Sequence, residues 1–158
     1  MSTSTFGGHT SEKQLRSSSQ NLIRISNRRM NLAFLAGFIL FFAFGERSDA
    51  MPSPNQLRWE PIAREAARAA GIDECIFVAL INQESTWDPR AENGPCHGIA
   101  QINPAFHPVD PYDAKASLFY AARLIQSYKI EGGSYEKALG AYNWGAGNMR
   151  ANGWAIPP

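Results

Sequence analysis

The spacing of apolar residues predicts a mainly α-helical protein in the second part of this chain. Apolar positions recur at helical intervals over residues 60–70, and Gly71 is a suitable helix end. We expect Pro61 at the first helical position, where proline loses no hydrogen bond. Residues 51–55 precede this helix and are expected to form a stiff, polar linker.

A second helix is predicted after Asp73, whose side chain can cap it. Its expected apolar face comprises Ile72, Cys75, Ile76, Ala79, Leu80 and Gln83, widened by Phe77. At about 100° per residue, Glu84 falls on the edge of this face. Pro89 keeps Asp88 out of helical geometry, so the helix should end within a turn of Glu84.

Residues 89–112 contain five prolines and two glycines, which predicts a long loop or a short two-stranded element. A third helix is expected over residues 113–129. Gly132 and Gly133 then form a turn, and Ser134 can cap a fourth helix that ends near residue 145 or 147. The predicted fold is a small, mainly α-helical domain over residues 52–158 with one long functional loop.

Residues 1–50 differ from this domain, because a polar tail precedes an uncharged apolar run over residues 32–44. A membrane-spanning helix needs about 17–25 residues, so this run has the length of a signal-peptide core. Arginines precede it and Ser48-Asp49-Ala50 follows it. We expect export to the periplasm or cell envelope by a cleaved signal. An uncleaved membrane anchor, and a translation start at Met30 rather than Met1, stay open.

The chain carries 15 basic and 14 acidic side chains, a net charge of +1. Six basic and three acidic residues lie in residues 1–51. The remaining residues therefore carry nine basic and eleven acidic side chains, a net charge of −2. An acidic domain has few cations for phosphate contacts. The charge distribution therefore argues against a nucleic-acid partner.

Cys75 and Cys96 are the two cysteines of the chain. In an exported protein such a pair predicts a disulfide, worth about 3 kcal/mol for a loop of this length. Two unpaired thiols remain the alternative. The cysteines together with His97 and His107 lack the close spacing of a metal site, so we expect no metal and no cofactor.

Glu84 is the candidate catalytic residue. Partial burial raises the pKa of a carboxyl group, and a protonated carboxyl can donate its proton to a glycosidic oxygen. Asp88 is the nearest other acid, but its place before Pro89 suits a turn. Asp110 and Asp113 are suited to capping a helix. One acid without a clear partner favours a mechanism in which the substrate supplies the nucleophile.

Gln101, Tyr142 and Asn143 are the candidate substrate-binding residues. Their amide and phenol groups can bind sugar hydroxyls or N-acetyl groups, although each could also brace a loop. Gly98 precedes Gln101 and could let a sugar approach the backbone closely.

Three segments of the chain carry a specific resemblance. They are Glu-Ser-Thr-Trp-Asp-Pro at 84–89, Gly-Ile-Ala-Gln-Ile-Asn-Pro at 98–104 and Ala-Leu-Gly-Ala-Tyr-Asn-Trp-Gly at 138–145. Together they resemble the soluble lytic transglycosylase family, related in fold to goose-type lysozyme, over about residues 58–150. The resemblance implies that Glu84 is the single acid/base and that Gln101, Tyr142 and Asn143 line the site. Cys96, His97 and Ala100 depart from the family's usual residues and leave substrate preference open.

The resemblance also implies a substrate and a reaction. Members cleave peptidoglycan glycan strands between N-acetylmuramic acid and N-acetylglucosamine without water, leaving 1,6-anhydromuramoyl ends. Small members open the wall locally for secretion, conjugation or pilus machinery, or for a phage. We expect a monomer acting in this way. A hydrolase on the same fold and a non-catalytic wall-binding module are the alternatives.

Overall fold

The computed structural model describes residues 51–156. Its elements are α3 (Pro54–Ala70), α4 (Glu74–Ser85), β1 (Glu92–Asn93), β2 (Cys96–His97), α5 (Ala114–Gly132), α6 (Tyr135–Trp144) and α7 (Ala146–Ala151). The predicted mainly helical class is thereby confirmed. The expected signal or anchor at residues 32–44 lies outside the described residues. No helix within the described part is long and apolar enough to cross a membrane.

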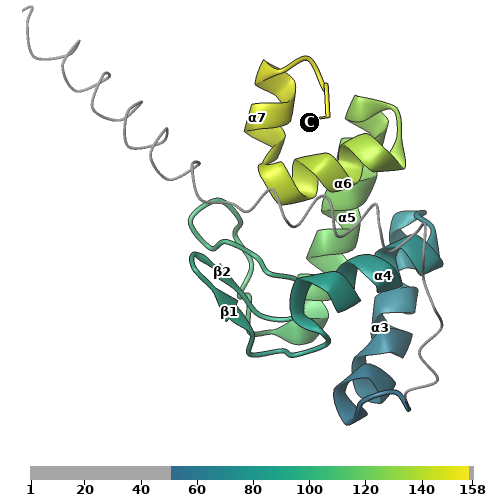
Figure 1. The fold of residues 1–158 in the computed structure, drawn as a ribbon. Coiled ribbons are helices and arrows are strands. Elements are labelled where there is room, and N and C mark those ends of the chain that lie inside the picture. Colours follow the sequence, from purple (N-terminus) through teal and green to yellow (C-terminus); the bar gives the residue numbers. More distant parts are fainter. Residues whose placement is uncertain (1–50, 157–158) are drawn as a thin grey trace, which may run out of the picture. The chain divides into compact units, whose positions relative to one another are not determined.

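Helix α5 is the central element of this domain. It packs against both α3 and α6, while α4 packs against α3 and α7 against α6 (Figure 1). The antiparallel β1–β2 hairpin lies in the connection from α4 to α5. Small side chains form much of the core of these helices: Ala63, Ala66, Ala67, Ala121, Ala122, Ala138 and Ala141. Such residues let helix axes approach closely, which makes a compact core possible in a short domain.

The start of α3 differs from the prediction. Ser53 caps the helix by accepting a hydrogen bond from the Gln56 N–H at 3.1 Å, and Pro54 occupies the first position. Pro61 lies inside the helix, so residues 54 and 55 are helical and are not part of a linker. The error arose because two prolines could each begin the helix, and only the earlier one follows a capping serine.

Helix α4 begins as predicted, because Asp73 accepts a hydrogen bond from the Ile76 N–H at 2.9 Å. Its end is set by two residues with left-handed backbones, Thr86 (φ 51°) and Trp87 (φ 68°). The chain therefore leaves the helix before the restriction from Pro89 applies. Trp87 is only 1 % exposed and belongs to the core.

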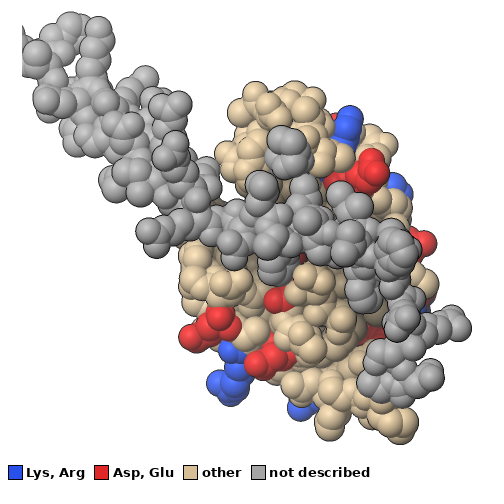
Figure 2. Space-filling view, viewed as in Figure 1, with Lys and Arg blue, Asp and Glu red and all other residues tan. Residues whose placement is uncertain are grey.

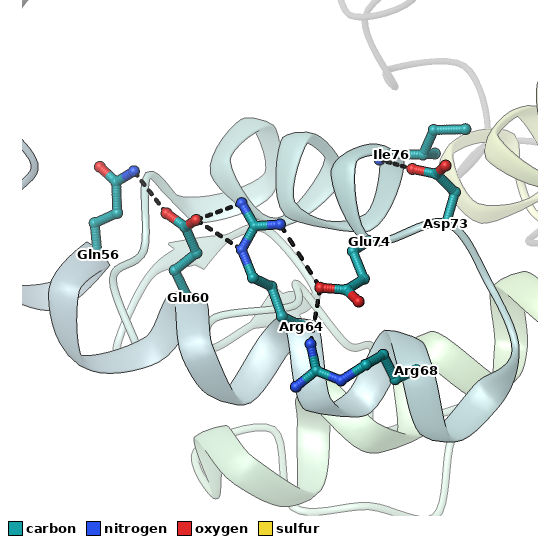
Figure 3. A network of polar contacts seen from close by, with 7 residues as sticks. All are labelled: Gln56, Glu60, Arg64, Arg68, Asp73, Glu74 and Ile76. Atoms are coloured by element: carbon teal, nitrogen blue, oxygen red, sulfur yellow. Dashed lines mark hydrogen bonds and ion pairs between the residues drawn. The ribbon is translucent and has the colours of Figure 1, made fainter.

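A network of polar side chains holds the first turn of α4 against α3 (Figure 3). Arg64 contacts Glu60 at 2.6 Å and Glu74 at 3.8 Å, and Arg68 contacts Glu74 at 2.9 Å. Gln56 also donates to Glu60 at 3.0 Å. Partly exposed pairs contribute little stability singly, so this network serves mainly to orient α4.

The second half of the domain follows the predicted pattern, with one added element. Asp113 caps α5 and Ser134 caps α6, as expected. The two-stranded alternative for the loop is confirmed by the β1–β2 hairpin. Helix α7 was not predicted, because Gly145 separates it from α6 within what looked like a single helix end.

Gly98 has a different role from the one expected. Its φ is +73°, and a Cβ atom there would lie 1.8 Å from the Pro111 carbonyl oxygen. Gly98 is buried and lies against protein backbone, so the expected close approach of a sugar to this residue is wrong. The contact instead fixes the loop after β2 against the segment before α5.

We predict that Gly98→Ala destabilises the domain by about 3 kcal/mol or more. The alanine would have to adopt a left-handed backbone, and its Cβ would overlap the Pro111 carbonyl oxygen. Urea unfolding of the variant measures this. Gly94→Ala is the matched control, because its φ is also positive (+59°) but nothing lies within 4 Å of the added Cβ. An equal loss of unfolding free energy in the two variants would contradict the packing role of Gly98.

Candidate active site

Glu84 lies in the last turn of α4, on the buried face of the helix. The buried residues of α4 are Phe77, Leu80 and Ile81, which precede Glu84 by seven, four and three positions. These intervals place Glu84 in the middle of the apolar face, and not at its edge as the sequence suggested. The predicted face was rotated around the helix, since Cys75 is exposed.

Burial raises the pKa of the Glu84 carboxyl from 4.5 to about 7. The cause is the loss of water around the charged form, which costs free energy in apolar surroundings. Because this pKa is near neutral, the carboxyl can both donate and accept a proton under physiological conditions. This is the electrostatic property that a general acid/base requires.

Gln101 lies in the loop that follows β2. Its side-chain Nε2 donates to the Gly98 carbonyl at 2.9 Å and to the Ala91 carbonyl at 3.3 Å. Its backbone is left-handed, with φ 48°. The residue is 9 % exposed, and its Oε1 is buried without a hydrogen-bond partner. The NH2 group braces the loop, which is the structural role expected for this residue, while binding of a sugar by the free oxygen stays a prediction.

Tyr142, from α6, brings a third part of the chain to the site. Its hydroxyl donates to the Ala100 carbonyl at 2.6 Å. The pKa of Tyr142 is raised well above its ordinary value, first by burial and then by the negative charge of Glu84. Tyr142 is therefore an electrostatic neighbour of Glu84, and its phenol stays protonated as a hydrogen-bond donor.

Asn143 is not hydrogen-bonded to the other candidate residues. It follows Tyr142 in the last turn of α6 and is partly buried, and within residues 51–156 its amide makes no hydrogen bond to Glu84 or Gln101. Asp88 is exposed and accepts a hydrogen bond from the Arg90 N–H at 2.9 Å. Its predicted role in a turn is confirmed.

The predicted disulfide between Cys75 and Cys96 is wrong, since both are free thiols. Cys75 lies in the first turn of α4, nine residues before Glu84, which corresponds to about 13 Å along a helix. Cys96 lies near the other end, where burial and then the charge of Glu84 raise its pKa. A disulfide needs Cα atoms within about 7 Å. The sequence pattern missed Cys96 as a neighbour of the acid.

The coloured residues of Figure 2 form no continuous basic patch. On the face shown there, acidic and basic side chains are scattered among uncharged ones. Within residues 51–156, no group of histidines, cysteines and carboxylates is arranged to hold a metal ion. His107 contacts the Tyr120 hydroxyl at 3.1 Å and so connects the long loop to α5.

A family model described as the Transglycosylase SLT domain matches residues 61–154, more than half of the chain. The chain belongs to this family of peptidoglycan lytic transglycosylases, as its motifs predicted. No solved structure was found to match the chain.

We predict that both thiols react with Ellman's reagent in the native protein without prior reduction. Cys75 is exposed and should react first. Cys96 should react more slowly, because it is partly buried and its raised pKa lowers the thiolate fraction. Cys75→Ser should leave only the slow phase, and a protein with no titratable thiol before reduction would contradict the free pair.

We predict that the stability of the wild type falls between about pH 4.5 and pH 7 because of Glu84. The folded state holds this proton up to about pH 7 and the unfolded state only to about 4.5, so unfolding releases a proton in this window. The stabilisation is complete below 4.5 and is lost as pH rises through 7. The loss should be roughly 2–3 kcal/mol.

Urea unfolding of wild type and Glu84→Gln at pH 4.5 and pH 8 measures this effect. The amide resembles the protonated carboxyl, so the two proteins should be similarly stable at pH 4.5. At pH 8 the variant should be the more stable. A stability difference that is the same at both pH values would contradict a buried, proton-binding Glu84.

Proposed function

We propose that this chain is a peptidoglycan lytic transglycosylase in which Glu84 is the single catalytic acid and base. The observation that supports this most directly is the raised pKa of Glu84 on a helix face that is otherwise apolar. Tyr142 is an electrostatic neighbour of Glu84, and its hydroxyl is hydrogen-bonded to the loop that bears Gln101. Family membership supplies the substrate class, the peptidoglycan glycan strand.

The proposed reaction begins with protonated Glu84. Its proton passes to the oxygen that joins N-acetylmuramic acid to N-acetylglucosamine, and the bond from that oxygen to the anomeric carbon breaks. The N-acetyl oxygen of the muramoyl residue attacks the anomeric carbon and forms an oxazolinium ion. Glu84, now a carboxylate, takes the proton of the C6 hydroxyl. The C6 oxygen then displaces the N-acetyl oxygen and closes the 1,6-anhydro ring.

The distribution of the other carboxylates favours this scheme over a two-carboxylate glycosidase. A hydrolase of the ordinary kind needs a second carboxylate about 5–10 Å from the acid. Asp88 caps a turn on the surface, while Asp110 and Asp113 accept hydrogen bonds from the backbone N–H groups of Tyr112 and Ala116. These local roles support a nucleophile supplied by the substrate.

We assign supporting roles to the remaining predicted residues. The unpartnered Gln101 oxygen can accept a hydrogen bond from a sugar hydroxyl or amide N–H. Tyr142 places a neutral phenol beside the acid and limits the water around it. Asn143 can contact the N-acetyl group from the neighbouring position on α6.

We further propose that the domain acts in the cell envelope, delivered or tethered by the N-terminal segment that includes residues 32–44. Arginines precede this apolar run in the sequence, as in export signals. A small domain of this kind suits local opening of the wall for an envelope-crossing machine or a phage. The charge of the domain gives no support for a nucleic-acid partner.

We predict that Glu84→Gln lowers cleavage of purified sacculi by at least about 100-fold, because the amide can neither donate nor accept the transferred proton. Zymography and mass spectrometry of the digests measure activity and product. Wild-type digests should contain 1,6-anhydromuramoyl ends, and Asp88→Asn should retain activity as the matched control.

Each alternative function gives a different result in the same experiment. Reducing muramic acid ends alone would indicate a hydrolase. Wild-type protein that binds sacculi but releases no fragments, with Glu84→Gln behaving identically, would indicate a binding module.

A further inference from the structure

Three consecutive backbone carbonyls, those of residues 98–100, each accept a hydrogen bond from a side chain. In chain order the donors are Gln101 Nε2 at 2.9 Å, Ser85 Oγ at 2.8 Å and the Tyr142 hydroxyl at 2.6 Å. We call these three bonds the carbonyl clamp. One donor comes from the loop itself, one from α4 and one from α6, so the clamp holds the loop to two helices at once.

Ser85 is the member of the carbonyl clamp that belongs to the helix of the catalytic acid. It follows Glu84 directly and is the last residue of α4. Its hydroxyl lies 2.8 Å from the Ile99 carbonyl but 3.4 Å from the Ile81 carbonyl of its own helix, so the loop is its main partner. In the described part of the chain, no other hydrogen bond joins α4 to residues 98–101.

The clamp also determines which atom Gln101 presents. Its Nε2 faces two carbonyl oxygens, those of Ala91 and Gly98, and these contacts require a donor. The reverse orientation of the amide would place an acceptor against two acceptors. The buried Oε1 is consequently left without a partner and can only accept. A substrate group that binds it must be a hydroxyl or an amide N–H.

We propose that Ser85 is a positioning residue, which sets the distance between the Glu84 carboxyl and the Gln101 acceptor through its bond to the loop. This inference rests on the proposed function. Sugar bound to Gln101 is oriented relative to the acid only if the loop and α4 move as one body. Ser85 provides that connection, and it needs no contact with the substrate.

Ser85→Ala removes the hydroxyl and tests this role on soluble, uncrosslinked glycan strands. We expect kcat to fall about 10-fold or more, because small displacements of a reacting group lower rates strongly, while KM changes less. Ser85→Thr keeps the hydroxyl and should restore most of the activity. Ser53→Ala is the control, because it removes a serine hydrogen bond from the N-cap of α3. It should lower the melting temperature without changing kcat.

A double-mutant cycle tests whether Ser85 acts through the loop. If it does, Ser85→Ala should lower kcat/KM much less in a Gln101→Ala background than in the wild type. Additive effects, or unchanged kcat in Ser85→Ala with only a loss of melting temperature, would overturn the inference. If Ser85→Ala does not fold, Ser85→Cys keeps the size with a weaker donor, and kcat equal to wild type would overturn it likewise.

The activity of the wild-type protein distinguishes a failure of this inference from a failure of the proposed function. Wild-type protein that releases no fragments from glycan strands overturns the function, whatever the variants do. Wild-type activity together with an unimpaired Ser85→Ala overturns the positioning role alone.

Discussion

The structure depends on keeping one carboxyl group in apolar surroundings. Glu84 lies on the same helix face as Phe77, Leu80 and Ile81, and burial raises its pKa to about 7. Glu84 is partly buried, and a charge in such apolar surroundings lowers stability, so the surrounding elements must limit the water that reaches the carboxyl. The polar network between α3 and α4 orients the first turn of α4. Just after the end of α4, the buried Trp87 anchors the chain in the core.

The loop after β2 is irregular, yet its shape is well determined by contacts from outside it. Its carbonyl groups are satisfied by Ser85, Gln101 and Tyr142 rather than by a sheet, and Gly98 lies directly against Pro111. Buried carbonyls need partners, and side chains from two helices can supply them only when both helices are correctly placed. The position of the Gln101 oxygen therefore depends on how the two helices are packed.

Features that depend on a few neighbouring residues could be predicted from the sequence. The caps by Asp73, Asp113 and Ser134 were predicted correctly, because a capping side chain bonds to an N–H only three residues away. The predicted start of α3 was wrong, because two prolines could each begin the helix. The prediction also treated α6 and α7 as a single helix. The Cys75–Cys96 disulfide was wrong because composition and cellular compartment suggest a pair, whereas only geometry decides whether two thiols can meet.

The sequence by itself determined the family and the helical class, since three ordered motifs and the helical spacing of apolar residues lie in the chain itself. The tertiary structure alone decided that Glu84 is central on its buried face, that Ser85 bonds to Ile99, and that the Gln101 oxygen is the free acceptor. The contacts of Ser85 and Tyr142 with the loop join residues 14 and 42 positions apart. Local preferences extend only a few residues along a chain, so contacts at such separations exist only once the helices have packed.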